Sequence, residues 1–408
     1  MRIAALALAG LLAAQAAAAD PKKVLFVGNS FSFGRVDPVM SYNAANVHDL
    51  THAMWLANPG GSNAFEPHPW GGVAGIFKQF TAQKNLDYDV SLSARNAASL
   101  RGHMLNTNPA GWDLRGNVAS QTWDQVVLQE QSDEPLLRRT NVNNVSLGSN
   151  PEYARIYADK LEDFIHQGTG HQYRERDLIG GNQTACIAAG YSSTACSTQR
   201  TIPTNPLASM ATQVYLYQTW ARQDMVHGAF RTTRDDTTGA VTRTTDLSTA
   251  TFFDGLETMT EELRLAFLDM ADKADDDGSG GFAGIAPVGE AFMRAVQQGV
   301  ATRDMWAPGA GADGLVDLWF DDGLHASAHG SYLSALTLFG TLTGLDPLSL
   351  GAAEIAARDL GISAADAVAL QRIASQQLGF TQPVPEPGTW AMMLAGLAAL
   401  AGVARRRK

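Results

Sequence analysis

The residue types that could perform chemistry lie in two short segments near opposite ends of the chain. Near the N-terminus, an apolar run ends in Gly28, Asn29 and Ser30. Near the other end, Asp322 precedes His325 by three positions. A serine hydroxyl is a weak nucleophile unless a base takes its proton, and an imidazole base needs a carboxylate to orient it. Each segment alone is more typical of a turn, but together they predict a hydrolase with Ser30 as nucleophile, His325 as base and Asp322 as orienting carboxylate.

Alternating strands and helices must bring these two segments together. Short apolar runs rich in β-branched and aromatic residues predict five buried strands, at residues 24–27, 90–93, 125–128, 213–217 and 282–286. Helix-like stretches between and after them cover residues 154–166, 258–271, 290–300 and 329–342. This alternation predicts an α/β fold, with a five-stranded parallel sheet covered by helices on both faces. Ligands of such sheets bind at the carboxyl ends of the strands, and Ser30 directly follows the first of them.

The Gly-Asn-Ser segment after the first strand, combined with Asp-x-x-His near the end of the body, resembles the SGNH (GDSL-like) hydrolase family. The resemblance runs from about residue 23 to residue 344. It implies a flavodoxin-like three-layer α/β/α sandwich that hydrolyses esters through a Ser-His-Asp triad and an acyl-enzyme, without a cofactor. Asn29 stands where the family usually has Asp, a departure that leaves the nucleophile unaffected.

The resemblance also implies an oxyanion hole made by the N–H of Ser30, a Gly N–H after the second strand and an Asn side chain after the third. No Gly follows the second strand, so Ala97 or a neighbour is the candidate, since every residue except Pro has a backbone N–H. In place of the Asn, Gln131 aligns best, and Gln129 lies on the same face two residues earlier. Either amide would keep the donor. The alternative is that both glutamines only satisfy loop backbone.

The segment after the fourth predicted strand supplies candidates for the rim of the site. Thr219, Trp220 and Arg222 could contact substrate there, although an aromatic residue at a strand end is more often simple packing. The wording Gln-Glu-Gln-Ser at residues 129–132 resembles a branch of the superfamily near the carbohydrate acetyl esterases. This resemblance, together with the C-terminal sorting signal described below, whose family accompanies exopolysaccharide producers, favours acetyl esters on an acylated extracellular polysaccharide (exopolysaccharide) as the substrate.

Both ends of the chain have the composition of targeting signals. Residues 1–19 combine Arg2, a short apolar run and small residues before Asp20, which predicts a signal peptide removed by a signal peptidase. Residues 383–408 contain Pro-Glu-Pro, fifteen uncharged residues and a terminal basic cluster. They resemble the PEP-CTERM sorting signal, which implies a transient inner-membrane helix, an exosortase-type processing enzyme, and delivery to the cell envelope or outside. A plain C-terminal transmembrane anchor is the alternative.

The body between these signals predicts one hydrolase domain at residues 20–346, followed by a helical appendix at residues 347–382. Long insertions are expected at about residues 168–206 and 231–248. The two cysteines of the chain, Cys186 and Cys196, lie in the first insertion. Because export leads to an oxidising compartment, we expect them to form a disulfide, with two unpaired thiols as the alternative.

Charge argues against one class of partner. The chain has 30 Lys and Arg against 41 Asp and Glu, a net charge of −11. Such an acidic protein repels phosphate backbones, so nucleic acid is not an expected partner.

The sequence gives only weak indications of a metal site. Zinc sites need three or four ligands, and neither cluster of histidines and aspartates offers a convincing set. These clusters are His325 and His329 with Asp321 and Asp322, and His48 and His52 with Asp49. Residues 275–280 resemble the start of a calcium loop, but Ala286 stands where a bidentate Glu belongs. No metal is therefore expected.

Two alternatives to the serine esterase remain: a metal-dependent hydrolase, and an envelope-displayed binding or matrix protein that keeps the fold without catalysis.

Overall fold

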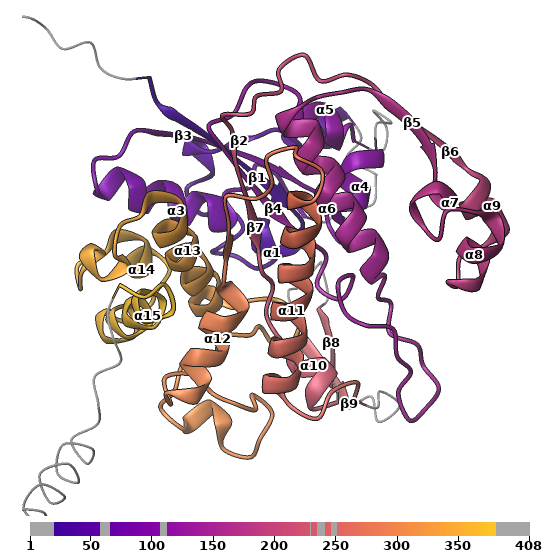
Figure 1. Cartoon of the computed structure of the whole chain (residues 1–408). Coiled ribbons are helices and arrows are strands. Elements are labelled where there is room, and N and C mark those ends of the chain that lie inside the picture. The colour runs from indigo at the N-terminus through magenta and orange to yellow at the C-terminus, as the bar shows by residue number, and fades with distance from the viewer. Residues whose placement is uncertain are drawn as a thin grey trace, which may run out of the picture.

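The centre of the computed structural model is a six-stranded parallel sheet (Figure 1). The structure describes residues 20–57, 66–106, 112–228, 230–234, 241–245 and 251–380. The strand order is β10-β7-β4-β1-β3-β2, and every neighbouring pair is parallel. The strands are β1 (Lys22–Gly28), β2 (His48–Asp49), β3 (Tyr88–Ala94), β4 (Gln125–Gln129), β7 (Gln213–Tyr217) and β10 (Gly284–Ala286).

The five strands predicted from the sequence are all present, and their order across the sheet, numbered by position in the chain, is 2-1-3-4-5, which is the flavodoxin-like arrangement. The sheet nevertheless has six strands where five were predicted, because the two-residue β2 adds an edge beside β3. β1 and β4 lie at the centre, where both faces are covered, and their apolar side chains are almost completely buried. In this register Gly28 pairs with Ala94, and Val27 lies beside Leu128, so three strands end next to the Ser30 segment.

Helices cover both faces of the sheet, as expected. On one side α3 packs against α13, which in turn contacts α15; on the other side α6 packs against α4 and α11 (Figure 1). The four helices predicted from the sequence correspond to α6, α11, α12 and α13. The helices are α1 (Ser30–Phe33), α2 (His52–Ala57), α3 (Gly72–Gln83), α4 (Leu100–Leu105), α5 (Leu114–Val118), α6 (Pro151–His166), α7 (Glu175–Leu178), α8 (Gln183–Ala188), α9 (Ser193–Ser197), α10 (Gln223–Val226), α11 (Leu256–Asp275), α12 (Val288–Gln297), α13 (Ala328–Thr343), α14 (Ile355–Asp359) and α15 (Ala364–Gln377).

The first expected insertion forms a separate lobe beside α4 and α6 (Figure 1). It contains the antiparallel pair β5 (His171–Arg174) and β6 (Gln199–Ile202), together with the short helices α7 to α9. Cys186 and Cys196 form a disulfide within it. The buried carboxylate of Glu175 anchors the lobe, because it accepts hydrogen bonds from Arg101 of α4 (2.9 Å) and Arg200 of β6 (3.0 Å).

The second expected insertion contains another antiparallel pair, β8 (Phe230–Arg234) with β9 (Val241–Thr245). At the C-terminal end of the described chain, α15 packs on α12 and α13, so the predicted appendix extends one helical layer of the sandwich. Residues 1–19 and 381–408, with the predicted signal peptide and the whole sorting segment, lie outside the described residues. Among the helices that the structure describes, none has both the length and the apolar composition required to cross a membrane.

Candidate active site

Ser30 begins α1 in the tight turn that follows β1. Asn29 caps this helix: its side-chain oxygen accepts from the N–H of Phe31 (3.0 Å), and its amide nitrogen donates to the carbonyl of Ala98 (2.9 Å). A Cβ at Gly28 would lie 2.3 Å from Ser32 Oγ and 2.5 Å from the Gln129 amide oxygen. The turn therefore requires glycine before Asn29, and it is held by Ala98, which follows β3, and by Gln129 at the end of β4.

The three side chains predicted to act together lie in one chain of hydrogen bonds. Ser30 Oγ is 2.9 Å from His325 Nε2, and His325 Nδ1 is 2.6 Å from Asp322 Oδ2. Asp322 Oδ1 also accepts the backbone N–H groups of Leu324 and His325, each at 2.9 Å. The carboxylate thus closes the loop that carries the imidazole and orients the ring at the same time.

The electrostatics of Asp322 suit this orienting position. Burial alone would raise the pKa of its carboxyl, but the hydrogen bond and charge of His325, with the two backbone N–H groups, lower the pKa below its ordinary value. Asp322 is therefore ionised at neutral pH. A carboxylate on Nδ1 favours the tautomer with its proton there, which leaves Nε2 to accept the proton of Ser30.

Thr219 and Trp220 lie beneath the site and not at its rim, so the expectation that they contact substrate is wrong. Both are fully buried, with 0% exposure. The Trp220 ring stacks on Phe31 with 4.1 Å between centroids and an 8° angle between planes. Its Nε1–H donates to the carbonyl of Leu324 at 3.1 Å. Trp220 therefore connects the residue after Ser30 with the residue before His325.

Arg222 is also largely covered, with 11% of its side chain exposed. Its guanidinium donates to both carboxylate oxygens of Asp224, at 3.0 and 2.6 Å, and to Ser132 Oγ at 3.1 Å. Burial would lower the pKa of Arg222, but the nearby carboxylates of Asp224, Asp133 and Asp322 raise it. Arg222 was expected to contact substrate, but its guanidinium instead binds Asp224 and Ser132 and so connects the loops around the site.

Gln129 supports the Ser30 turn, which corrects the expectation that its side chain is an oxyanion donor. Its amide oxygen accepts from the N–H of Asn29 and from Ser32 Oγ, both at 3.0 Å. Because a backbone N–H can only donate, the orientation of the amide is fixed. The amide nitrogen then donates to the carbonyl of Glu130, and the residue is fully buried.

Gln131 and Ala97 have accessible positions at the same edge of the sheet. The Gln131 amide oxygen accepts from the N–H groups of Asp133 (3.0 Å) and Glu134 (3.2 Å), and within the described residues no hydrogen bond uses its amide nitrogen. Ala97 has a φ of +54°, in the left-handed region that glycine adopts most easily. The turn for which the resemblance expects Gly is therefore formed here by Ala.

Two buried groups near the turn were missed in the sequence. Glu130 accepts from the N–H of Leu100 (3.0 Å) and of Gln131 (2.6 Å), which ties the segment after β3 to the segment after β4. Burial, helped by the charge of Glu134, raises the pKa of Glu130 well above its ordinary value. His103 Nε2 lies 2.8 Å from the carbonyl of Gly28, and burial lowers the pKa of His103 to about 4. The position of Glu130 two residues after the strand predicted at residues 125–128 was the only available signal.

The histidines considered as metal ligands in the sequence have other partners in the structure. His325 is hydrogen-bonded within the Ser30 chain, and His329 lies 4.0 Å from Asp366. His48 pairs with Asp89 at 2.9 Å, whereas Asp49 binds the buried His68 at 2.6 Å.

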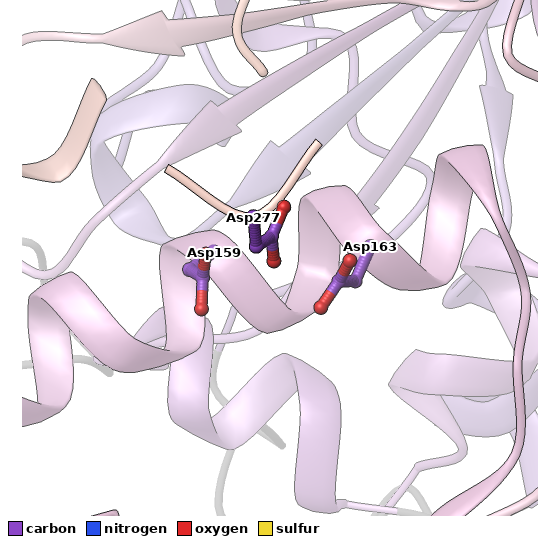
Figure 2. Close-up of side chains that lie close together, drawn as sticks. All are labelled: Asp159, Asp163 and Asp277. Atoms are coloured by element: carbon purple, nitrogen blue, oxygen red, sulfur yellow. The ribbon is translucent and has the colours of Figure 1, made fainter. Parts of the chain in front are cut away.

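A different acidic group is formed by Asp159 and Asp163 of α6 with Asp277, as Figure 2 shows. Their carboxylate oxygens lie within 4.8 Å of one another. Residues 275–280, which resemble the start of a calcium loop, thus contribute Asp277 to this acidic group, and α6 contributes the other two carboxylates. Carboxylate oxygens are the ligands that Ca²⁺ prefers, but Lys273 already lies 3.3 Å from Asp159 and neutralises part of this charge.

Comparison with known proteins identifies the C-terminal segment. The PEP-CTERM protein-sorting motif matches residues 383–408, which therefore carry a sorting signal that implies export and processing by an exosortase. No curated protein matches the chain.

Solved structures similar to the chain include SGNH and GDSL-like hydrolases. A Slackia heliotrinireducens protein assigned to the SGNH hydrolases is 18% identical over 79% of this chain and 100% of that chain, with a TM-score of 0.36. A DUF4886 family protein from Bacteroides uniformis is 14% identical over 91% and 99%, with a TM-score of 0.39. An acetyl xylan esterase from Butyrivibrio proteoclasticus is 9% identical over 66% and 56%, with a TM-score of 0.25. At these low scores no activity is transferred from them.

Proposed function

We propose that the chain is an exported serine ester hydrolase with Ser30, His325 and Asp322 as its catalytic triad. The observation that supports this proposal best is the continuous chain of hydrogen bonds from Ser30 Oγ through both imidazole nitrogens to Asp322, at 2.9 and 2.6 Å. These are the distances at which a base can take a proton from a nucleophile.

In the first half-reaction, Ser30 Oγ forms a bond to the ester carbonyl carbon and its proton passes to His325 Nε2. The tetrahedral intermediate then collapses, the bond to the leaving alcohol breaks, and that alcohol receives the proton from Nε2. Water repeats the sequence on the acyl-enzyme, so that the carboxylic acid leaves and Ser30 regains its proton. Asp322 stabilises the imidazolium that forms in each half-reaction.

The negative oxygen of each tetrahedral intermediate needs donors at the same edge of the sheet. We assign this role to the N–H of Ser30, a backbone N–H at or near Ala97, and the amide nitrogen of Gln131. Ala97 supports this assignment because its φ of +54° forms the turn that would otherwise require glycine.

For the substrate we propose acetyl esters on an exported polysaccharide. This choice follows from the resemblance of residues 129–132 to the carbohydrate acetyl esterases, together with the sorting signal at residues 383–408. A signal peptidase at residues 1–19 and an exosortase at the C-terminal segment would then release the domain into the cell envelope or beyond.

The test compares Ser30→Ala with Ser32→Ala, which removes a neighbouring buried hydroxyl from the same short helix. We expect Ser30→Ala to abolish p-nitrophenyl acetate hydrolysis and labelling by a fluorophosphonate, while Ser32→Ala retains both. Thermal unfolding should show that both variants are folded. Retained activity in folded Ser30→Ala would remove Ser30 from the mechanism. Loss of wild-type activity with a chelator would favour a metal-dependent reaction, and absence of labelling in the wild type would favour the binding protein.

A further inference from the structure

Glu130 is a fully buried acid near the Ser30 turn to which the proposed reaction gives no role. It directly follows β4, and none of its surface is exposed. Its Oε1 accepts from the backbone N–H of Leu100 at 3.0 Å and of Gln131 at 2.6 Å. Its Oε2 has no hydrogen-bond partner among the described residues. A buried polar atom without a partner costs free energy, so a role beyond stability is the natural place to seek its explanation.

The carboxyl group of Glu130 joins two strands that are not neighbours. In the sheet β1 lies between β3 and β4. Leu100 is the first residue of α4, the helix that follows β3, whereas Glu130 follows β4. The hydrogen bond from the Leu100 N–H to Glu130 Oε1 therefore connects the two segments that flank the carboxyl end of β1, where the Ser30 turn begins.

Two further hydrogen bonds close a ring around this turn. The side-chain nitrogen of Asn29 donates to the carbonyl of Ala98 at 2.9 Å, and the N–H of Asn29 donates to the amide oxygen of Gln129 at 3.0 Å. The bond between α4 and Glu130 is the third link, so the segments after β1, β3 and β4 are joined pairwise. Because the ring is closed, each link limits movement in the other two. Ser30 directly follows Asn29 and is held by the same ring.

α4 holds the turn through a second contact. His103 Nε2 lies 2.8 Å from the carbonyl of Gly28, and because a carbonyl can only accept, the ring nitrogen donates. Burial lowers the pKa of His103 to about 4, so the ring is neutral and keeps one proton for this bond. A shift of Leu100 at the beginning of α4 would therefore also move His103 relative to Gly28.

From this geometry we propose that Glu130 is a positioning residue, which holds the segments after β3 and β4 in place around the Ser30 turn. The inference rests on the proposed function, because two of the three assigned oxyanion donors lie in these segments, near Ala97 and on Gln131. Glu130 has no exposed surface with which to touch substrate. Its loss should weaken binding of the tetrahedral intermediate and not of the substrate, so the effect should appear in kcat and not in KM.

The protonation of Glu130 determines which substitution is conservative. Burial raises the pKa of Glu130 well above its ordinary value, and the charge of Glu134 adds to this effect. The neutral carboxyl group that this favours has one carbonyl oxygen, which can accept both N–H groups, and it places no negative charge beside an oxyanion. Glutamine has a carbonyl oxygen on a side chain of the same length. Glu130→Gln should therefore preserve both hydrogen bonds.

The experiment measures kcat and KM for p-nitrophenyl acetate in the wild type, Glu130→Gln, Glu130→Met and Glu130→Asp. Methionine keeps the unbranched side chain but loses the strong acceptor. Aspartate keeps the acid but is one methylene shorter, so it cannot bridge both N–H groups in the same geometry.

Glu354→Met is the matched control. Glu354 is also buried, with 2% exposure, and its carboxylate accepts the backbone N–H groups of Ala356 (2.8 Å) and Ala357 (2.7 Å) at the beginning of α14. This helix packs on α3 and α15. The control therefore removes a buried carboxyl group with two similar bonds from a different part of the fold.

We expect Glu130→Met and Glu130→Asp to lower kcat by about 10- to 100-fold, the range for catalytic groups displaced by about 1 Å. Glu130→Gln should stay within about threefold of the wild-type kcat, and KM should change less than about threefold in all three variants. Glu354→Met should lower the unfolding temperature about as much as Glu130→Met but leave kcat unchanged. If Glu130→Met does not fold, the contrast between Glu130→Asp and Glu130→Gln carries the test.

Four results would overturn the positioning role while leaving the esterase intact. The first is an unchanged kcat in folded Glu130→Met or Glu130→Asp, and the second is a raised KM with unchanged kcat. The third is an equal loss of kcat in Glu130→Gln and Glu130→Met, which would show that the acid itself takes part. The fourth is an equal loss of kcat in Glu354→Met, which would show a general stability effect. If the wild type does not hydrolyse p-nitrophenyl acetate at all, the proposed function itself is refuted, so the two failures are distinguishable.

Discussion

Substitution of Trp220 by Phe tests whether a fully buried side chain sets the geometry of the triad. The indole donates to the carbonyl of Leu324 at 3.1 Å and stacks on Phe31 at 4.1 Å. Phenylalanine keeps an aromatic ring for the stack but removes the donor. A partly buried carbonyl that loses its partner costs about 1–3 kcal/mol, and the smaller ring leaves a gap beside Phe292, which stacks on the other face at 4.8 Å.

The effect on catalysis should appear in kcat. If the loop that carries His325 moves by about 1 Å relative to Ser30, the rate falls by up to roughly 10²-fold, so we expect a 10- to 100-fold lower kcat for p-nitrophenyl acetate. KM should change less than about threefold, because Trp220 has no exposed surface with which to contact substrate.

A matched control is Trp319→Phe. The indole of Trp319 donates to the carbonyl of Ala221 at 2.9 Å and packs edge-on against Phe292 at 5.7 Å. This variant should lose a similar free energy of unfolding with little change in kcat. Equal losses of kcat in both variants would show a general stability effect. A raised KM with unchanged kcat in Trp220→Phe would show that Trp220 contributes to substrate binding. Either result refutes the positioning role.

Three further variants test the site and its surroundings. Asp322→Asn should keep the fold but lower kcat for p-nitrophenyl acetate by about 10³- to 10⁴-fold, because the imidazole loses the carboxylate that fixes its tautomer; a loss below tenfold would contradict this role. Ala97→Gly should raise the free energy of unfolding in urea by roughly 0.5–1 kcal/mol and retain activity, since Gly relieves a φ of +54°. Asp163→Asn should stabilise the protein by about 1 kcal/mol at pH 8, after discount for its partial exposure. Burial and the charges of Asp277 and Asp159 raise the pKa of Asp163 to about 6. The native state is therefore penalised as pH rises through about 4 to 6, and the gain should disappear in unfolding measurements at pH 4.

The fold was predictable from the sequence because its central strands have an unambiguous pattern. β1 and β4 are apolar on both faces, as a doubly covered parallel sheet requires, and long helices separate the strands. β2 was missed because two residues cannot show a periodicity, and its pairing with β3 depends on the neighbouring chain. α1 is similarly short, with four residues, and is fixed by the Asn29 cap.

Within the site, local geometry was predictable and burial was not. Asp322 and His325 are three positions apart, and backbone N–H groups of their own loop fix the carboxylate. Their contact could therefore be predicted from the sequence alone. The alternation of strand side chains placed Gln129 on the same face as Gln131, but no pattern could show that the N–H of Asn29 and the hydroxyl of Ser32 bind its amide oxygen.

Trp220 illustrates the same limit on a larger scale. Its burial depends on Phe31 from the first strand–helix turn and on Phe292 from α12, which are far apart in the sequence. A residue at the end of a strand can face either the ligand or the loops beneath it, and only the positions of these distant partners decide between the two.

The loop that carries the base is held mainly through its backbone. Trp220 binds the carbonyl of Leu324, the N–H of Gln223 donates to the carbonyl of Gly323 at 2.9 Å, and the carbonyl of His325 accepts from the N–H of Phe320 at 2.7 Å. Gly323 has a φ of +67°, and a Cβ there would lie 2.4 Å from the Trp306 ring. Contacts to carbonyls and N–H groups do not depend on which side chains the loop carries. The position of the imidazole is therefore determined largely by Gly323 and by the residues that bind this backbone.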